Sequence, residues 1–180
     1  VSNRRSSITS WCGWSARSQP PALWSLKSTG WRCNSSALSP ARSPLRHWNI
    51  GEGDKVAVIG LGGLGHMALK LANALGAEVT LFTRSPDKEA DARQLGAHHV
   101  VLSSNKAQMK SVRGQFALII DTVPYVHDLD PYIPTLATGG TLVLVGYLGP
   151  LDPALNTGPM VMNRKAVAGS LIGGIAETQE

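Results

Sequence analysis

A glycine-rich run lies between a short apolar segment and a helical pattern, and it constrains the fold more than any other feature. Its residues are Gly60, Leu61, Gly62, Gly63, Leu64 and Gly65. The preceding segment 55–59 is short and apolar, which is typical of a buried strand. After the run, apolar residues recur every three or four positions over 64–75, which predicts an amphipathic helix that ends before Gly76.

A glycine turn of this kind between a strand and a helix predicts a dinucleotide-binding site. Gly60 permits the tight turn, Gly62 lets the backbone approach a pyrophosphate, and Gly65 lets the helix lie close to the strand. The helix N-terminus then faces the negative charge of the phosphates. Glycine-rich turns also occur for purely structural reasons, and that alternative stays open at this point.

The rest of the chain alternates short apolar runs with helical patterns. Strands are predicted at 79–82, 100–102, 117–121, 141–145 and 167–172. One helix is predicted at 86–95, with Ser85 as its N-cap and Gly96 at its end, and another near 129–136, where Pro134 would cost a hydrogen bond. This alternation predicts an α/β fold with a doubly wound parallel sheet and right-handed crossovers.

The residues after the second strand indicate which dinucleotide the site would bind. A site for NAD usually has Asp or Glu here, which binds the ribose 2′-hydroxyl. This chain has Thr83, Arg84 and Ser85 instead, followed by Lys88. Two positive charges and two hydroxyl groups suit a 2′-phosphate, so the pattern favours NADP over NAD. The alternative is that Arg84 and Lys88 are solvated surface charges and Ser85 is only a helix cap.

The N-terminal segment 1–42 differs in composition from the rest of the chain. It contains six basic residues, no acidic residue, eleven serines and four tryptophans, whereas residues 43–180 contain eleven basic and twelve acidic residues. Because it lacks apolar periodicity, we expect a disordered or irregular segment at 1–42 and a folded domain at 43–180. A basic arm with aromatic residues that binds single-stranded nucleic acid is the alternative interpretation of 1–42.

Several classes of protein are excluded or disfavoured by the sequence. No apolar run reaches the roughly 20 residues of a membrane-spanning helix, and 1–18 has no continuous apolar core of a signal peptide, so we expect a cytoplasmic protein. Cys12 and Cys33 are too few for a disulfide scaffold or a four-thiolate zinc site. Asp121 and Asp128 show no partner for acid–base work. We therefore expect no catalytic residue and no metal ligand in this chain.

Four motifs together resemble a known enzyme family. They lie at 43–48, 53–72, 120–124 and 168–174. The combination is similar to the zinc-dependent medium-chain alcohol dehydrogenases, and most similar to their NADP-dependent branch that resembles cinnamyl alcohol dehydrogenase. The resemblance implies a Rossmann-type domain over about 43–180. It also implies hydride transfer between NADPH and an aldehyde whose oxygen is polarised by a catalytic zinc.

The resemblance also implies which residues contact the cofactor. The run from Gly60 to Gly65 would bind the pyrophosphate, and Thr83, Arg84, Ser85 and Lys88 would surround the 2′-phosphate. Thr122 and Gly146 would line the cofactor, while Ser170, Leu171 and Ile172 would run beside the nicotinamide. The alternatives are purely structural roles: Thr122 in a strand-end turn, Gly146 as a glycine after a strand, and Ser170 as a buried hydroxyl. Family members dimerise through the last strand of this domain, so the resemblance allows a homodimer, whereas a nucleic-acid partner is not expected.

The resemblance does not extend to the family's catalytic domain. Its zinc-binding cysteines and histidine have no counterpart in 1–42, and the sequence stops where a helix of the family begins. We therefore expect a fragment, the NADP-binding domain of an alcohol dehydrogenase that lacks its catalytic zinc domain and is inactive alone. A shifted reading frame or misassigned start would explain 1–42. Three alternatives stay open: a free-standing dinucleotide-binding or redox-sensing module with a basic arm, a non-functional product that folds poorly, and a zinc-free quinone reductase.

Overall fold

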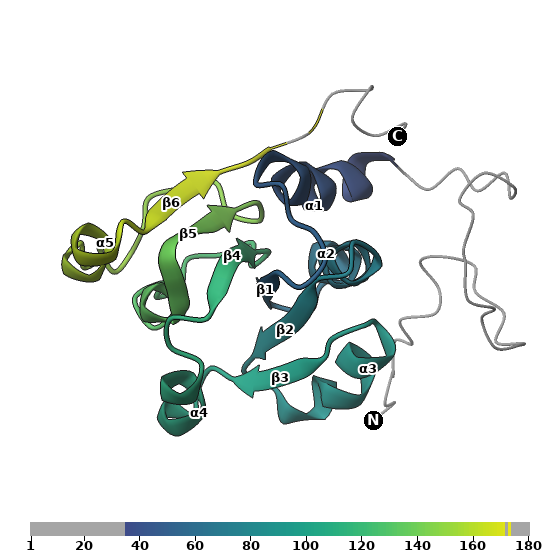
Figure 1. Ribbon diagram of the computed structural model, residues 1–180, viewed down its shortest axis with the longest axis horizontal. Helices are drawn as coiled ribbons and strands as arrows, with labels where there is room; N and C mark the ends of the chain where they lie inside the picture. The colour runs from purple at the N-terminus through teal and green to yellow at the C-terminus, as the bar shows by residue number, and fades with distance from the viewer. Residues whose placement is uncertain (1–34, 172, 174–180) are drawn as a thin grey trace, which may run out of the picture. The chain divides into compact units, whose positions relative to one another are not determined.

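In the computed structural model, which describes residues 35–171 and residue 173, six parallel strands form one sheet (Figure 1). The strands are β1 (Lys55–Ile59), β2 (Glu78–Thr83), β3 (His99–Leu102), β4 (Phe116–Asp121), β5 (Leu136–Leu144) and β6 (Ala166–Gly169). Their order is β3-β2-β1-β4-β5-β6, and every neighbouring pair is parallel. The chain thus winds from β1 to β3 and then from β4 to β6, which confirms the predicted doubly wound Rossmann-type fold.

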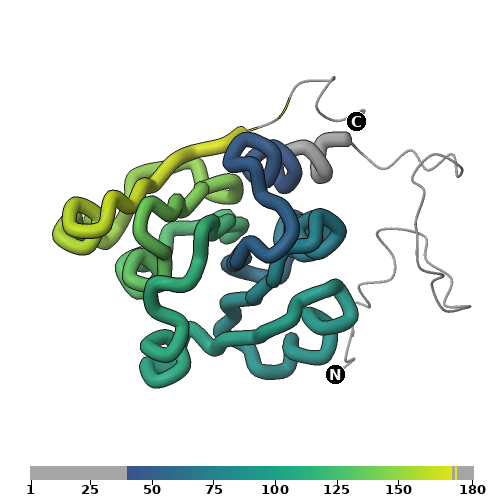
Figure 2. The backbone as a smooth tube through the Cα atoms, in the orientation of Figure 1, coloured from purple at the N-terminus to yellow at the C-terminus, as the bar shows by residue number. Residues whose placement is uncertain are grey.

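Helices cover both faces of the sheet. On one face lie α1 (Ser35–His47), α2 (Gly63–Ala74) and α3 (Glu89–Gln94). On the other lie α4 (Lys106–Ser111), α5 (Gly158–Asn163) and the 3₁₀ turn η3 (Ile133–Thr135). The strands at the two edges, β3 and β6, lie at opposite ends of the sheet (Figure 2).

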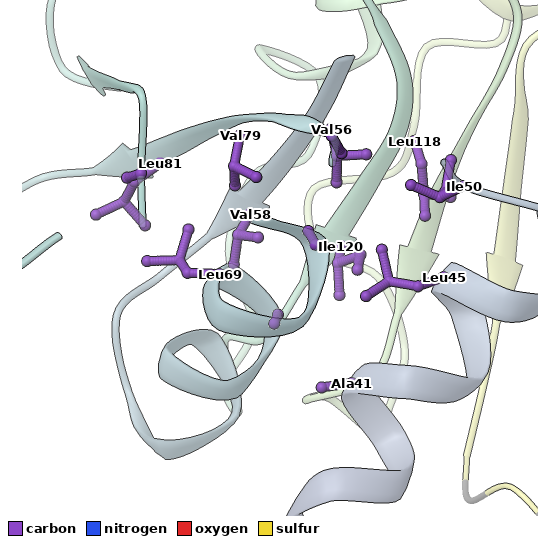
Figure 3. Close-up of a cluster of buried hydrophobic side chains, with 14 of the residues drawn as sticks. Ala41, Leu45, Ile50, Val56, Val58, Leu69, Val79, Leu81, Leu118 and Ile120 are labelled. Carbon is purple, nitrogen blue, oxygen red and sulfur yellow. The ribbon is translucent and has the colours of Figure 1, made fainter. Parts of the chain in front are cut away.

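The core is divided by the sheet into two hydrophobic clusters. Along β1, Val56 and Val58 belong to the cluster beneath α1 and α2, whereas Ala57 and Ile59 belong to the cluster on the opposite face. This alternation follows from the two-residue period of a strand. The close-up in Figure 3 shows side chains of α1, α2 and the central strands gathered between the helices and the sheet.

Helix α1 crosses the boundary that we expected between the N-terminal segment and the domain. It begins before Ser43, and its residues Ala41 and Leu45, one turn apart, are fully buried in the core. Asn49 ends the helical segment in the left-handed conformation, with φ of 51°. Two prolines within the helix, Pro40 and Pro44, obscured it in the sequence, because proline removes a helical hydrogen bond.

The second predicted helix, 86–95, forms as two shorter elements. A 3₁₀ turn, η2 (Pro86–Lys88), leads into α3, and the segment ends before Gly96, whose φ is 99°. Ser85 lies at the N-cap position, but its side chain makes no capping bond. Its backbone N–H instead donates to Thr83 Oγ1 at 3.2 Å. The predicted N-cap position of Ser85 is therefore confirmed, but the predicted capping hydrogen bond of its side chain is wrong.

The prediction of a helix near 129–136 is wrong. Only the three-residue turn η3 forms there, with Pro134 in its first turn, and Leu136 already starts β5. The apolar residues that produced the helical pattern, Leu129, Tyr132, Ile133 and Leu136, are all buried in one cluster. Their spacing therefore reflects burial under the sheet and not helical periodicity.

Other differences concern element ends and short helices. Strand β5 begins earlier than the predicted 141–145, and β6 ends at Gly169, so the predicted strand 167–172 is too long. The short helices α4 and α5 were not predicted. Asn105 caps α4 by accepting from the N–H groups of Ala107 and Gln108 at 3.0 and 3.3 Å, a signal that the sequence did contain.

Within the described part of the chain, no helix has both the length and the apolar character required to cross a bilayer. The predictions made for residues 1–34 and for Ile172 lie outside the described residues. The same holds for 174–180.

Candidate functional site

The carboxyl ends of the parallel strands meet at one edge of the sheet, and the predicted site residues follow these ends. Ile59, the last residue of β1, lies opposite Phe82 of β2 and Asp121 of β4. Asp121 in turn lies opposite Leu144 of β5. Because β1 and β4 start the two halves of the winding, the turns after them border the crevice where such sheets bind ligands.

The first and last glycines of the turn are required by its geometry. Gly60 has φ of 88°, a conformation that side chains disfavour, and its N–H donates to the Phe82 carbonyl at 3.0 Å. At Gly65 an added Cβ would collide with the carbonyl oxygen of Gly60. The absence of a side chain at Gly65 therefore lets α2 approach the end of β1, as the motif predicts.

The middle glycines of the turn face open space. An added Cβ at Gly62 or Gly63 would meet no atom within 4 Å. Gly62 is the N-cap residue of α2 and no side chain caps this end of the helix. The first-turn N–H groups and the positive end of the helix dipole are thus available to a negatively charged group. This arrangement can bind a phosphate through backbone atoms.

Thr122 holds the turn after β4 against the glycine turn. Its N–H and its hydroxyl both donate to the Ile59 carbonyl, at 3.1 and 2.8 Å, and the residue is buried. Gly146, after β5, lies so close to Thr122 that an added Cβ would fall 2.6 Å from its carbonyl oxygen. Both predicted residues therefore lie at the crevice, and both are engaged in protein contacts that fix its floor.

The four residues predicted to bind a 2′-phosphate follow β2. Thr83 is buried, and its hydroxyl accepts from the Ser85 N–H, whereas Arg84 is exposed and Lys88 and Ser85 are half-buried. Arg84 Nη2 donates to the hydroxyl of Tyr125 at 3.1 Å. Tyr125 belongs to the turn after β4, so this bond joins the segment after β2 to the segment after β4. Tyr125 was not identified from the sequence, because no sequence pattern relates residues 84 and 125, which are 41 positions apart.

The residues predicted beside the nicotinamide follow β6. The Ser170 N–H donates to the Leu144 carbonyl at 3.0 Å, which continues the β5–β6 pairing by one residue. Leu171 is exposed. Ser170 is thus positioned at the same edge of the sheet as the glycine turn.

A buried polar pair at this edge was missed. Asp121, which we expected to lack a partner, is 1% exposed, and its Oδ2 lies 3.5 Å from Nε2 of His127. Burial, the largest effect, raises the pKa of the Asp121 carboxyl, while the Val123 N–H and His127 lower it. The only sequence signal was an acidic residue that ends an apolar strand.

His66 lies in the first turn of α2. Burial, followed by the charge of Lys70, lowers the pKa of its imidazole. The side chain is therefore neutral at neutral pH, so it adds no charge to the phosphate end of the helix.

Metal binding is not supported by the described residues. Among them, no three His, Cys, Asp or Glu side chains converge on a point where a metal ion could be held. The described residues therefore do not fit a zinc ion.

Comparison with known proteins decides the family. A family model described as zinc-binding dehydrogenase matches residues 63–180. The chain belongs to this family. The resemblance seen in the sequence motifs is therefore confirmed, and the glycine turn, α2 and the sheet form the nucleotide-binding fold of a zinc-binding dehydrogenase.

Individual members of the zinc-binding dehydrogenase family match the same region. NADP-dependent alcohol dehydrogenase C 1 of Mycolicibacterium smegmatis is 47% identical over 140 residues, which are 77% of this chain and 39% of that protein. The structure of cinnamyl alcohol dehydrogenase from Sorghum bicolor matches with 37% identity and a TM-score of 0.76, over 80% of this chain and 41% of that one. The Helicobacter pylori enzyme of this name, complexed with NADP(H), matches with 41% identity and a TM-score of 0.68, over the same shares.

The chain spans about 40% of the length of the curated relatives that it matches. The chain therefore aligns with only one part of these relatives, which agrees with the fragment predicted from the sequence.

Proposed function

We propose that this chain is the NADP(H)-binding part of a zinc-type alcohol dehydrogenase that interconverts aldehydes and alcohols. One observation carries the proposal: the open backbone at Gly62 and Gly63 lies in front of the uncapped N-terminus of α2, where the winding of the sheet reverses. This place suits the pyrophosphate of a dinucleotide. The proposal extends to a cytoplasmic location, as expected from the sequence.

The end of β2 supports NADP(H) as the dinucleotide. No acidic residue lies between Thr83 and Pro86 to repel a 2′-phosphate, and the Arg84 guanidinium is exposed at the crevice. Arg84 would bind the phosphate as a charge-assisted fork, with Ser85 and Lys88 beside it. Relatives named for NADP dependence or crystallised with NADP(H) support the same choice.

The other contacts follow from the same geometry. Thr122 and Gly146 would form the floor under the cofactor, and the backbone at Ser170 and Leu171, followed by Ile172, would flank the nicotinamide. When bound, the nicotinamide supplies or accepts the hydride. Aldehyde and alcohol substrates are proposed from the names of the relatives, and their binding would require the remainder of the protein.

Calorimetric titration of NADPH and NADH against Arg84→Ala tests the proposal. We expect NADPH binding to weaken by about 1–3 kcal/mol, the value of a hydrogen bond to a charged group, and NADH binding to remain the same. The matched control is Lys110→Ala, which removes one positive charge from the exposed last turn of α4. Equal weakening of both cofactors would remove Arg84 from the 2′-phosphate site, and no binding by the unmodified chain would overturn the proposed function.

A further inference from the structure

Asp121 and His127 form a buried contact that the proposed cofactor contacts do not use. Asp121 Oδ1 accepts from the Val123 N–H at 3.1 Å, and Oδ2 lies 3.5 Å from His127 Nε2. Neither Oδ2 nor Nε2 makes a hydrogen bond within the described part of the chain, and both atoms are shielded from solvent. The surrounding side chains include Val126, Leu129, Leu144 and Leu151, which offer no polar group.

The hydrogen bond of His127 Nδ1 determines whether a proton must lie between Nε2 and Asp121. His127 Nδ1 lies 3.0 Å from the backbone carbonyl oxygen of Tyr125. A carbonyl oxygen can only accept, so Nδ1 must carry a proton. In the neutral imidazole Nε2 is then a bare lone pair that faces the Asp121 carboxyl. A proton must therefore lie on one of the two facing atoms, because two facing acceptors in apolar surroundings repel each other.

The electrostatic environment agrees with a bound proton. Burial is the largest influence on Asp121 and raises the pKa of its carboxyl. The folded protein thus holds this proton more tightly than the unfolded chain, and the stability that it contributes is lost as pH rises through the raised pKa. The other titratable or charged groups around the pair are Tyr132, whose pKa is raised by burial, Tyr147, whose hydroxyl donates to the Pro150 carbonyl, and the exposed Arg84 and Asp128.

The pair bounds the loop that contacts the glycine turn. Asp121 is anchored to β5, because its carbonyl oxygen accepts from the N–H groups of Val145 and Gly146 at 3.0 and 3.2 Å. The next residue, Thr122, donates to the Ile59 carbonyl. Val123 lies 3.1 Å from where a Cβ on Gly60 would stand. A repulsion between Asp121 and His127 would therefore displace the segment that positions the glycine turn.

We propose that Asp121 and His127 share one proton and act as a positioning pair, which holds the loop 122–127 against the glycine turn and makes NADP(H) binding depend on that proton. This inference rests on the proposed function. Neither residue is among those proposed to contact the cofactor. When the pair loses its proton, the loop moves away and the affinity falls.

The first experiment measures NADPH affinity of the full chain over the range of pH in which the chain stays folded. For the unmodified chain, Kd should rise with pH, by up to about tenfold per pH unit once the proton is lost. In Asp121→Asn the amide can donate to Nε2 permanently while its oxygen still accepts from Val123, so this rise should disappear. Asp128→Asn makes the same change at the exposed residue directly after this loop and should keep the rise. The 2′-phosphate of NADPH titrates in the same way with all three proteins, so it cannot cause a difference between their pH profiles.

The second experiment needs no cofactor. Long-range ¹H–¹⁵N spectra of the histidine-labelled chain should show a proton on His127 Nδ1, and an Nε2 chemical shift that Asp121→Asn changes and Asp128→Asn does not. An unprotonated Nδ1, or identical pH profiles of affinity for Asp121→Asn and the unmodified chain, would overturn the inference. If NADPH binds to none of the proteins, the proposed function fails and the positioning role with it, while an Nε2 chemical shift changed by Asp121→Asn alone would still support the shared proton.

Discussion

The four glycines that follow β1 and lead into the first turn of α2 have different physical roles, although the sequence presents them as one motif. Gly60 adopts a left-handed conformation and Gly65 leaves no room for a side chain. Gly62 and Gly63 have ordinary φ values and empty space before them. Gly60 and Gly65 are thus required by the fold, whereas the empty space before Gly62 and Gly63 suits a ligand.

Substitution to alanine should separate these roles. Gly65→Ala should lower the free energy of unfolding by about 1–3 kcal/mol, because the new methyl group overlaps the Gly60 carbonyl. Gly62→Ala should leave stability within about 0.5 kcal/mol and weaken NADPH binding, because the methyl group occupies the space proposed for the pyrophosphate. Urea unfolding and calorimetric titration measure the two effects. A normal NADPH affinity in Gly62→Ala would exclude the pyrophosphate from this place.

Among the elements, α1 shows how a helix can form against its local propensity. It contains two prolines and no acidic residue in its first turn, yet Ala41 and Leu45 are fully buried. Burying a leucine side chain is worth about 1.5–3 kcal/mol. Contact with α2 and the rest of this hydrophobic cluster thus offsets part of what the two prolines cost the helix.

Leu45→Ala should test the contribution of α1. The lost burial and the cavity left behind should lower the free energy of unfolding by about 2–5 kcal/mol, measured by urea denaturation. Leu148→Ala is the matched control, because Leu148 is 89% exposed and its truncation should change stability by less than about 0.5 kcal/mol. Similar effects of the two substitutions would show that α1 does not stabilise the domain.

For the whole molecule, the edge strand β6 is the feature that bears on assembly. It forms one end of the described sheet, and exposed apolar side chains, Val161 and Met162, precede it on α5. The Ser170 N–H points to β5, so the alternation of a strand turns the N–H groups of Val167 and Gly169 away from the sheet. An open strand edge of this kind favours pairing with a second copy.

Gly169→Pro should abolish a homodimer formed through this edge. Proline removes the outward N–H and leaves the β5–β6 hydrogen bonds in place. Analytical ultracentrifugation should show a dimer for the unmodified chain and a monomer for Gly169→Pro. Gly169→Ala should remain dimeric, because it keeps the N–H and its methyl group meets no atom within 4 Å. A monomeric unmodified chain, or a dimeric proline variant, would contradict this expectation.

Features that depend on neighbours along the chain could be predicted before the fold was known. The glycine turn, its flanking strand and helix, and the alternation that defines the parallel sheet were predicted because each depends on local backbone geometry and on a regular apolar period. The basic and hydroxyl residues after β2 were likewise found by their distance from the glycine turn. The cofactor contacts assigned to them stay predictions.

Only the tertiary structure decided the features that join distant residues. Helix α1 forms because Ala41 and Leu45 meet strands later in the chain, and the apolar residues of 129–136 are buried without forming a helix. The Arg84–Tyr125 bond and the Asp121–His127 pair arise where separate strand ends meet. Such contacts leave no period in the sequence, because burial and electrostatics act through space and the fold alone brings these groups together.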